Sequence, residues 1–302
     1  MRVYTRNKET GKRDLCDAKR GFSPYLRRAK DASMPNSPLG WLDFLVPKDG
    51  NSRQTATAIK FGPDPKHLLD LYAPKGKAGR LPLLIFSYGG GWDSGTRTEY
   101  SFAGRAFAAL GFLVAIADYR VFPEVRFPGF MEDLGAAASW LLAHVEEYGG
   151  DPDRVFLAGH SAGAYNAVML ALQPERFGAP GLRGRVEAVV GLSGPYDFYP
   201  FDVKQSIDAF GQYPEPLTTQ PINLVTPEAP PMFLAHGVAD TTVGDYHTVR
   251  LAAKLRENGV PVVERHYPGL RHEQPVLGLM RPFRGLWPVW RDVSGYLRER
   301  GR

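Results

Sequence analysis

The sequence predicts an α/β fold in which a mostly parallel central sheet carries helices on both faces. From about residue 54 onward, short apolar runs alternate with longer segments of helical spacing, which is typical of repeated strand–helix–strand units. The apolar runs, such as Leu81–Ser87 and Phe112–Asp118, are continuous, as expected for strands that are buried on both faces. In such sheets, functional side chains are expected at the carboxyl ends of the strands.

The expected elements follow one another along the chain. Gln54–Phe61 and His67–Tyr72 are expected to form an opening hairpin. Further strands are expected at Leu81–Ser87, Phe112–Asp118, Arg154–Gly159, Glu187–Leu192, Met232–His236 and Pro261–Tyr267. Helices are expected at Ser101–Leu110, Phe130–Tyr148, Ser161–Leu172, Tyr246–Asn258 and Leu286–Arg300. Residues 193–230, rich in Pro, Tyr, Phe and Asp, interrupt this alternation and are expected to form a loop or a small helical insertion, a candidate cap or lid.

Charge is distributed unevenly along the 302 residues. The net charge is +5, but residues 1–30 hold ten Lys/Arg and three Asp/Glu, a balance of 10 − 3 = +7, which leaves 5 − 7 = −2 elsewhere. We therefore expect a basic N-terminal extension, residues 1–37, followed by one catalytic domain, residues 38–302. The extension is either a solvated tail or a surface for polyanions or membranes. Its few aromatic residues argue against a nucleic-acid partner.

Cysteine content and hydropathy suggest a cytoplasmic protein. Cys16 is the single cysteine, so no intrachain disulfide can form. The first thirty residues lack the apolar stretch of a signal peptide, and the longest apolar run, Ala106–Ala117, is too short to span a bilayer. No group of His, Cys and Asp residues has metal-ligand spacing, so neither a metal nor a cofactor is expected. The oligomeric state, including a homodimer, is left open.

A Gly-x-Ser-x-Gly pattern at residues 159–163 suggests the nucleophile. It follows an expected strand and opens an expected apolar helix, the context that a nucleophile elbow requires. Ser161 would lie in a strained turn, and Gly159 and Gly163 would remove side chains that collide there. The alternative is a tight turn in which the serine only caps the helix.

A run of three glycines follows the expected strand Leu81–Ser87. Consecutive glycines leave backbone N–H groups free to approach a substrate, and acyl transfer needs such donors at the developing oxyanion. We assign the donors to the N–H groups of Gly90, Gly91 and Ala162. A flexible loop or a phosphate cradle are the alternatives, and the second lacks the Lys-Ser/Thr that normally follows.

His272 and Asp240 are the expected base and its orienting carboxylate. Where a nucleophile elbow carries the serine, the three catalytic residues follow one another along the chain as Ser, then Asp or Glu, then His. Beyond Ser161, the remaining histidines fall in strands or helices, whereas His272 follows the last strand in a loop. Asp240 follows the strand Met232–His236, and Asp245 is its competitor.

These motifs together resemble the carboxylesterase/lipase group of α/β-hydrolases, over residues 38–300. The group includes hormone-sensitive-lipase-like esterases and a branch of feruloyl and acetyl-xylan esterases. Residues 88–92, Tyr-Gly-Gly-Gly-Trp, are similar to the group's His-Gly-Gly-Gly loop with Tyr in place of His. Residues 118–124, Asp-Tyr-Arg-Val-Phe-Pro-Glu, resemble its Asp-Tyr-Arg-Leu-Ala-Pro-Glu stretch, and residues 150–154 are also typical. Residues 194–198 and 221–231 look closer to the feruloyl and acetyl-xylan esterase branch than to long-chain lipases. The resemblance implies an α/β-hydrolase fold and cofactor-free hydrolysis of short acyl esters.

The predicted function is therefore a serine carboxylesterase for small acyl or aryl esters. Its partner would be a small ester molecule, and four aromatic side chains are candidates for lining the substrate pocket: Trp92, Tyr165, Tyr196 and Phe198. Each has an alternative role in ordinary packing. An arylformamidase-like amide hydrolase and a catalytically silent binding protein of the same fold are the competing functions.

Overall fold

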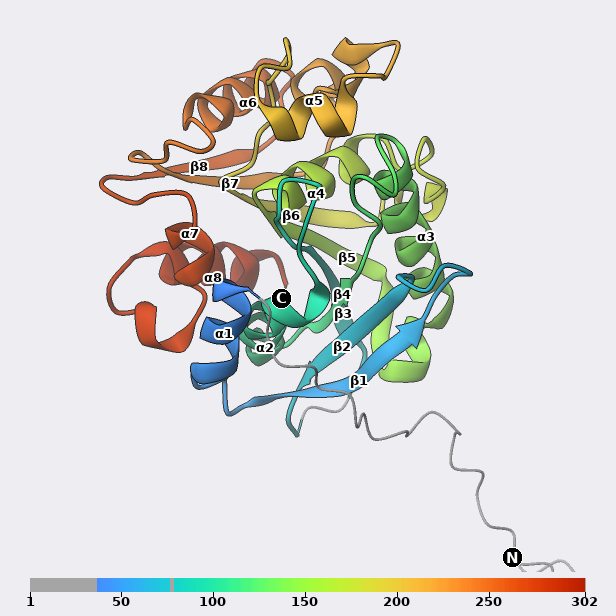
Figure 1. Ribbon diagram of the computed structural model, residues 1–302. Helices are drawn as coiled ribbons and strands as arrows, with labels where there is room; N and C mark the ends of the chain where they lie inside the picture. The colour runs from blue at the N-terminus through green and yellow to red at the C-terminus, as the bar shows by residue number, and fades with distance from the viewer. Residues whose placement is uncertain (1–36, 77–78, 302) are drawn as a thin grey trace, which may run out of the picture. The chain divides into compact units, whose positions relative to one another are not determined.

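An eight-stranded sheet forms the centre of the computed structural model, which describes residues 37–76 and 79–301 (Figure 1). Its spatial order is β1-β2-β4-β3-β5-β6-β7-β8; β2 is antiparallel to β1 and β4, and the other neighbouring pairs are parallel. The strands are β1 (Ser52–Lys60), β2 (Leu68–Pro74), β3 (Leu81–Ser87), β4 (Leu113–Ala117), β5 (Gly150–His160), β6 (Val186–Leu192), β7 (Met232–Gly237) and β8 (Val262–Tyr267). The predicted α/β class and the opening hairpin are confirmed.

Helices cover both faces of this sheet (Figure 1). On one face lie α2 (Ser101–Leu110) and α8 (Val289–Arg300), whose side chains Phe107 and Trp290 are in ring contact at 6.1 Å. On the other lie α3 (Gly129–His144), α4 (Ala162–Leu172) and α6 (Tyr246–Glu257). None of the helices in residues 37–76 and 79–301 is both long enough and apolar enough to cross a membrane.

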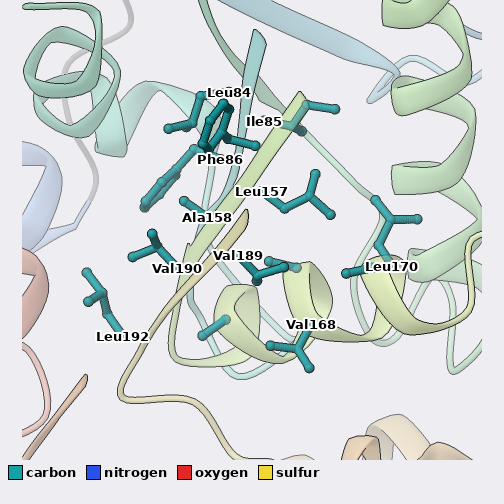
Figure 2. Close-up of a cluster of buried hydrophobic side chains, with 14 of the residues drawn as sticks. Leu84, Ile85, Phe86, Leu157, Ala158, Val168, Leu170, Val189, Val190 and Leu192 are labelled. Atoms are coloured by element: carbon teal, nitrogen blue, oxygen red, sulfur yellow. The ribbon is translucent and has the colours of Figure 1, made fainter. Parts of the chain in front are cut away.

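The core follows from the alternation of side chains along the buried strands. Leu157 and Val189 are register partners on β5 and β6 and point toward α4 (Figure 2). The next pair, Ala158 and Val190, points to the opposite face, as successive residues of a strand must (Figure 2). Because both faces are covered, β3, β4 and β7 are buried along their whole length. The rigid centre of the sheet thereby fixes the positions of the loops at its carboxyl edge.

Three short helices were not specified by the sequence pattern. Helix α1 (Pro38–Leu45) begins at Ser37, whose side chain accepts a hydrogen bond from Gly40 N at 3.0 Å. Helix α5 (Lys204–Phe210) lies in the expected insertion, and α7 (Gln274–Leu277) follows the last strand. The long helix expected from residue 130 to 148 ends at His144, and a 3₁₀ turn covers Val145–Tyr148.

The described residues fall within one compact unit, residues 34–302. Apart from Ser37, the expected basic extension, including Cys16, lies outside the described residues, so that division of the chain stays a prediction. Residues 193–230 are described, and besides α5 they contain two 3₁₀ turns, Pro216–Thr219 and Pro221–Leu224. Their function as a cap or lid also stays a prediction.

Candidate active site

Ser161 occupies a sharp turn between the end of β5 at His160 and the start of α4 at Ala162. Its backbone has φ 55° and ψ −127°, a conformation that L residues rarely adopt. Its N–H donates to the carbonyl of Leu192 at the end of β6, 2.8 Å away, which holds the turn against the sheet. The turn raises the hydroxyl above the carboxyl edge of the sheet, into a cavity.

Two glycines make this turn sterically feasible. A Cβ atom on Gly159 would lie 2.1 Å from the carbonyl oxygen of Gly163, and one on Gly163 would lie 2.1 Å from that of Ser87. Neither backbone atom can move aside without moving a central strand or the helix. A side chain at either position would therefore collide with the backbone, as the sequence predicted for Gly159 and Gly163.

Ser161, His272 and Asp240 form a hydrogen-bonded line. His272 Nε2 lies 2.8 Å from Ser161 Oγ, and His272 Nδ1 lies 2.7 Å from Asp240 Oδ2. His272 follows β8 and Asp240 follows β7, so adjacent strand ends bring the three residues together. A carboxylate only accepts hydrogen bonds, so Nδ1 carries the ring proton and Nε2 is free to accept the proton of the serine hydroxyl.

Asp240 is almost fully buried and accepts four hydrogen bonds. Its Oδ1 accepts the N–H groups of Thr242 and Val243, each at 2.9 Å, and its Oδ2 faces His272 and His236. Burial alone would raise the pKa of Asp240, but the hydrogen bonds from His236, His272 and Val243 outweigh it and hold the pKa well below its usual range. The carboxylate is therefore ionised at neutral pH.

Asp245 lies elsewhere, at the residue that precedes helix α6. Its Oδ2 is 3.4 Å from Nδ1 of His266, a residue near the end of the edge strand β8. His266 lies in a strand, as expected, and is partly buried. The structure thus brings Asp240, and not Asp245, to His272.

The glycine loop lies beside Ser161. Gly90, Gly91 and Trp92 have φ values of 134°, 59° and 61°, and a Cβ atom on Gly90 would lie 2.2 Å from the carbonyl oxygen of Ser94. Within the described part of the chain, the N–H groups of Gly90 and Gly91 donate no hydrogen bond. Ala162 is the first residue of α4, whose N–H has no partner inside the helix. All these residues line the cavity that contains Ser161.

Tyrosines anchor this loop, whose first residue is Tyr88. The Tyr119 hydroxyl donates to the Tyr88 carbonyl at 2.9 Å, and the two rings stack at 4.5 Å. The Gly89 N–H donates to the Tyr100 hydroxyl at 3.2 Å. These contacts hold the loop, so the tyrosine expected to stand in place of a histidine is compatible with an anchored loop.

A hydrogen-bond chain joins the glycine loop to the His272 loop. The Tyr100 hydroxyl, which accepts from Gly89, lies 3.3 Å from Nδ1 of His160. Nε2 of His160 lies 3.1 Å from the carbonyl oxygen of His272. A carbonyl only accepts, so Nε2 carries the proton and Nδ1 accepts from Tyr100. Burial, with the nearby His272 ring, lowers the pKa of His160 to about 3, so the chain stays uncharged.

The profile of the BD-FAE family matches residues 69–255, more than half of the chain. The chain belongs to the BD-FAE family. The matched residues include Ser161, Asp240 and the glycine loop, and they end before His272. The predicted resemblance to the carboxylesterase group of α/β-hydrolases is confirmed at the level of family and fold.

Known proteins similar to this BD-FAE member are esterases by name. A probable isoprenylcysteine alpha-carbonyl methylesterase of Arabidopsis thaliana is 30% identical over 76% of this chain, and the match covers 52% of that protein. Esterase LipC of Mycobacterium tuberculosis is 33% identical over 61% of this chain and 51% of its own length. A truncated carbohydrate esterase from gut microbiota has a TM-score of 0.73 at 21% identity, covering 85% of this chain and 99% of its own. The chain thus spans about half the length of these two sequence relatives.

The cavity above Ser161 has a volume of about 1040 Å³. Trp92 and Phe198, two of the four aromatic residues expected to line it, do so, and their rings stack at 5.8 Å. Val203 and Gln205 contribute a wall from the 193–230 segment. Such a large cavity with aromatic walls suits a small organic ligand.

The other two aromatic residues lie behind this wall, which corrects the sequence-based expectation. Tyr165 is fully buried, packs edge-on against Trp92 at 5.3 Å, and donates its hydroxyl proton to the carbonyl of Thr219 at 2.8 Å. Tyr196 is also fully buried, and its ring fills the space above Gly191 and Gly194. Neither lines the cavity, because the helix and loop that carry them direct both rings into the core.

Several residues at this site were missed by the sequence analysis. His236 and His160 were absent from the expected set because each lies in an apolar run at or next to the end of a strand. His247 lines the cavity from α6, and its Nδ1 accepts the N–H groups of Tyr196 and Asp197 at 3.3 and 3.2 Å. The spacing of His236 four residues before Asp240 was the one available signal.

Proposed function

We propose that this BD-FAE protein is a serine carboxylesterase that hydrolyses short-chain acyl or aryl esters through an acyl-enzyme intermediate. Ser161 is the nucleophile, His272 the general base, and Asp240 the carboxylate that orients the base. The 2.8 Å separation of Ser161 Oγ and His272 Nε2 is the observation that carries this proposal. The names of the esterase relatives support it independently.

The proposed reaction has two halves. His272 Nε2 takes the proton of the Ser161 hydroxyl while Oγ attacks the ester carbonyl carbon, and the proton then goes to the leaving alcohol oxygen. Water attacks the acyl-serine in the second half, with His272 again accepting a proton and returning it to Oγ. Asp240 stabilises the imidazolium that forms each time and fixes the ring tautomer.

The tetrahedral intermediate places negative charge on the former carbonyl oxygen. We assign the N–H groups of Gly90, Gly91 and Ala162 as the donors that stabilise it. Gly90 and Gly91 support this assignment because their N–H groups donate to nothing else in the described structure. Removing one such donor in other serine hydrolases slows turnover by about 10²–10³.

Labelling with a fluorophosphonate probe, together with the burst of p-nitrophenolate from p-nitrophenyl acetate, tests the proposal. Ser161→Ala should abolish both, because the acyl-enzyme can no longer form. Ser193→Ala is a matched control: Ser193 also follows a strand and has φ 53°, but its buried hydroxyl has no hydrogen-bond partner in the described residues. The control should keep label and burst. Labelling that survives in Ser161→Ala, or is absent from the unmodified protein, contradicts the proposal.

The two competing functions give different results with the same protein. An arylformamidase would label at Ser161 but would prefer N-formylkynurenine over an aryl acetate by about a thousandfold or more. A catalytically silent binding protein would show neither label nor burst. Side-by-side values of kcat/KM for the two substrates therefore distinguish the three functions.

A further inference from the structure

A second cavity of about 590 Å³ adjoins the one above Ser161. The two share Gly90, Ser94, His160 and Glu273 in their linings, so they meet at the glycine loop. The first is bounded by aromatic residues and by the 193–230 segment. The second is bounded by α1 and α7, which lie next to each other (Figure 1). Its apolar lining residues are Pro38, Leu39, Leu42, Val276 and Leu277.

The walls of this second cavity are held in place. Asp43 of α1 is buried and accepts hydrogen bonds from Ser101 Oγ at 2.6 Å and Phe102 N at 2.8 Å, which fixes α1 on the start of α2. Asp49, just after α1, forms two hydrogen bonds with the Arg284 guanidinium, at 2.7 and 2.8 Å. This pair ties α1 to the segment that follows α7. The cavity is thus largely formed before any ligand arrives, which lowers the cost of binding.

The second cavity lies close to the reacting atoms. Gly89, which lines it, is so near the elbow that a Cβ atom there would be 3.1 Å from Ser161 Cβ. His160, at the boundary, is uncharged at neutral pH because burial lowers its pKa to about 3. An apolar chain beside this boundary therefore meets no charge on His160, and Glu273, the carboxylate that both cavities share, is exposed to solvent.

We propose that the second cavity, bounded by α1 and α7, binds a short unbranched aliphatic arm of the ester, while the aromatic cavity holds the other arm. This inference rests on the proposed esterase function and specifies its substrate class: esters with one aliphatic and one bulkier group. The aliphatic arm in the second cavity could be the acyl chain or the alcohol chain of the ester, because both consist of CH₂ groups. Two series of substrates distinguish these two cases. In one, p-nitrophenyl acetate, butanoate and hexanoate vary the acyl chain; in the other, ethyl, butyl and hexyl acetate vary the alcohol chain.

Values of kcat/KM along both series test this proposal. Each CH₂ group that is fully buried should raise kcat/KM about fourfold, so one series should rise roughly fifteenfold when two CH₂ groups are added. Leu42→Trp and Leu277→Trp should fill the cavity and reduce that rise to about twofold or less. Leu277→Ala should widen it and move the preference toward longer chains. Leu45→Trp is the matched control, because Leu45 also lies on α1 but is 72% exposed and does not line the cavity. In this variant, kcat/KM should rise with chain length as much as in the unmodified protein.

For each variant, the quantity compared is the ratio of kcat/KM for the longer ester to kcat/KM for the shorter one. Partial unfolding, which a Tm measurement detects, lowers both kcat/KM values equally and leaves this ratio unchanged. A flat response in both series for the unmodified protein overturns the proposal. So does a rise that survives both tryptophan substitutions, since the chain would then lie elsewhere. Absence of turnover on every ester, acetates included, shows instead that the proposed esterase function is wrong, and the subsite falls with it.

Discussion

His236 Nε2 lies 3.1 Å from Oδ2 of Asp240, the same oxygen that faces His272. The same nitrogen is 2.8 Å from the carbonyl oxygen of Val243, so it carries the ring proton, and Nδ1 accepts from the Thr248 hydroxyl at 2.9 Å. His236 is therefore a fixed donor behind the carboxylate. It helps to keep Asp240 ionised and in position, and it adds a second histidine to the proposed machinery as a positioning residue.

Asp240→Asn should lower kcat by about 10⁴, because an amide at this position favours the wrong tautomer of His272. Asp245→Asn is the matched control and should retain nearly full activity, since Asp245 faces His266. Steady-state kinetics on p-nitrophenyl acetate at pH 8 measures both. Near wild-type kcat in Asp240→Asn would remove Asp240 from the proposed triad.

Tyr100→Phe should lower kcat about tenfold and the free energy of unfolding by about 1–3 kcal/mol. The change leaves the buried Gly89 N–H without an acceptor and breaks the link from the glycine loop through His160 to His272. Tyr72→Phe is the control, because the buried Tyr72 hydroxyl has no hydrogen-bond partner among the described residues. It should change neither quantity by much. If Tyr100→Phe lowers stability but leaves kcat per folded molecule unchanged, the chain has only a structural role.

Gly163→Ala should lower the free energy of unfolding by at least about 2–3 kcal/mol and remove most activity. Its new Cβ atom would press on the carbonyl of Ser87, at the end of a central strand. Gly295→Ala is the opposite case: no atom lies within 4 Å of the new Cβ, and the residue is inside α8. It should raise stability by about 0.5–1 kcal/mol. Urea unfolding of both variants measures whether the free energy of unfolding falls in Gly163→Ala and rises in Gly295→Ala. Equal changes in the two variants would contradict the steric argument.

The positions of most strands along the chain and the position of Ser161 could be predicted because they depend on local features. Strands buried on both faces are continuous apolar runs, and the Gly159–Gly163 turn has a fixed steric requirement that its residue types reveal. Asp240 and His272 were predictable because the ends of the last two parallel strands lie side by side. For these residues, sequence order largely determines spatial order.

The remaining features depend on contacts between distant segments. The direction of the Tyr165 and Tyr196 rings is decided by packing against Trp92 and against Gly191, which no local pattern encodes. Helices α1 and α5 have eight and seven residues, too short for a clear periodicity. The second cavity needs α1 and α7, which are more than 220 residues apart in sequence, to lie together.

The last prediction concerns stability in acid and depends on His247. Burial, together with the nearby His236 ring and the positive charge of Arg250, lowers the pKa of His247 to about 4, against about 6.5 in an unfolded chain. Between these values the unfolded state binds the proton and the folded state does not. Stability is therefore fully present above about pH 6.5 and is lost as pH falls toward 4.

His247→Asn should make the protein less sensitive to acid. The side-chain oxygen of asparagine can accept the N–H groups of Tyr196 and Asp197 that Nδ1 accepts now, and it does not titrate. Between pH 7 and pH 4, the free energy of unfolding of the variant should fall by about 3 kcal/mol less than that of the unmodified protein. Urea unfolding at both pH values measures the difference, in which the contributions of His160 and the carboxylates cancel. If the free energy of unfolding falls equally in the two proteins, His247 takes up its proton as readily in the folded state as in the unfolded state. Its protonated ring could then not accept the two backbone hydrogen bonds in acid.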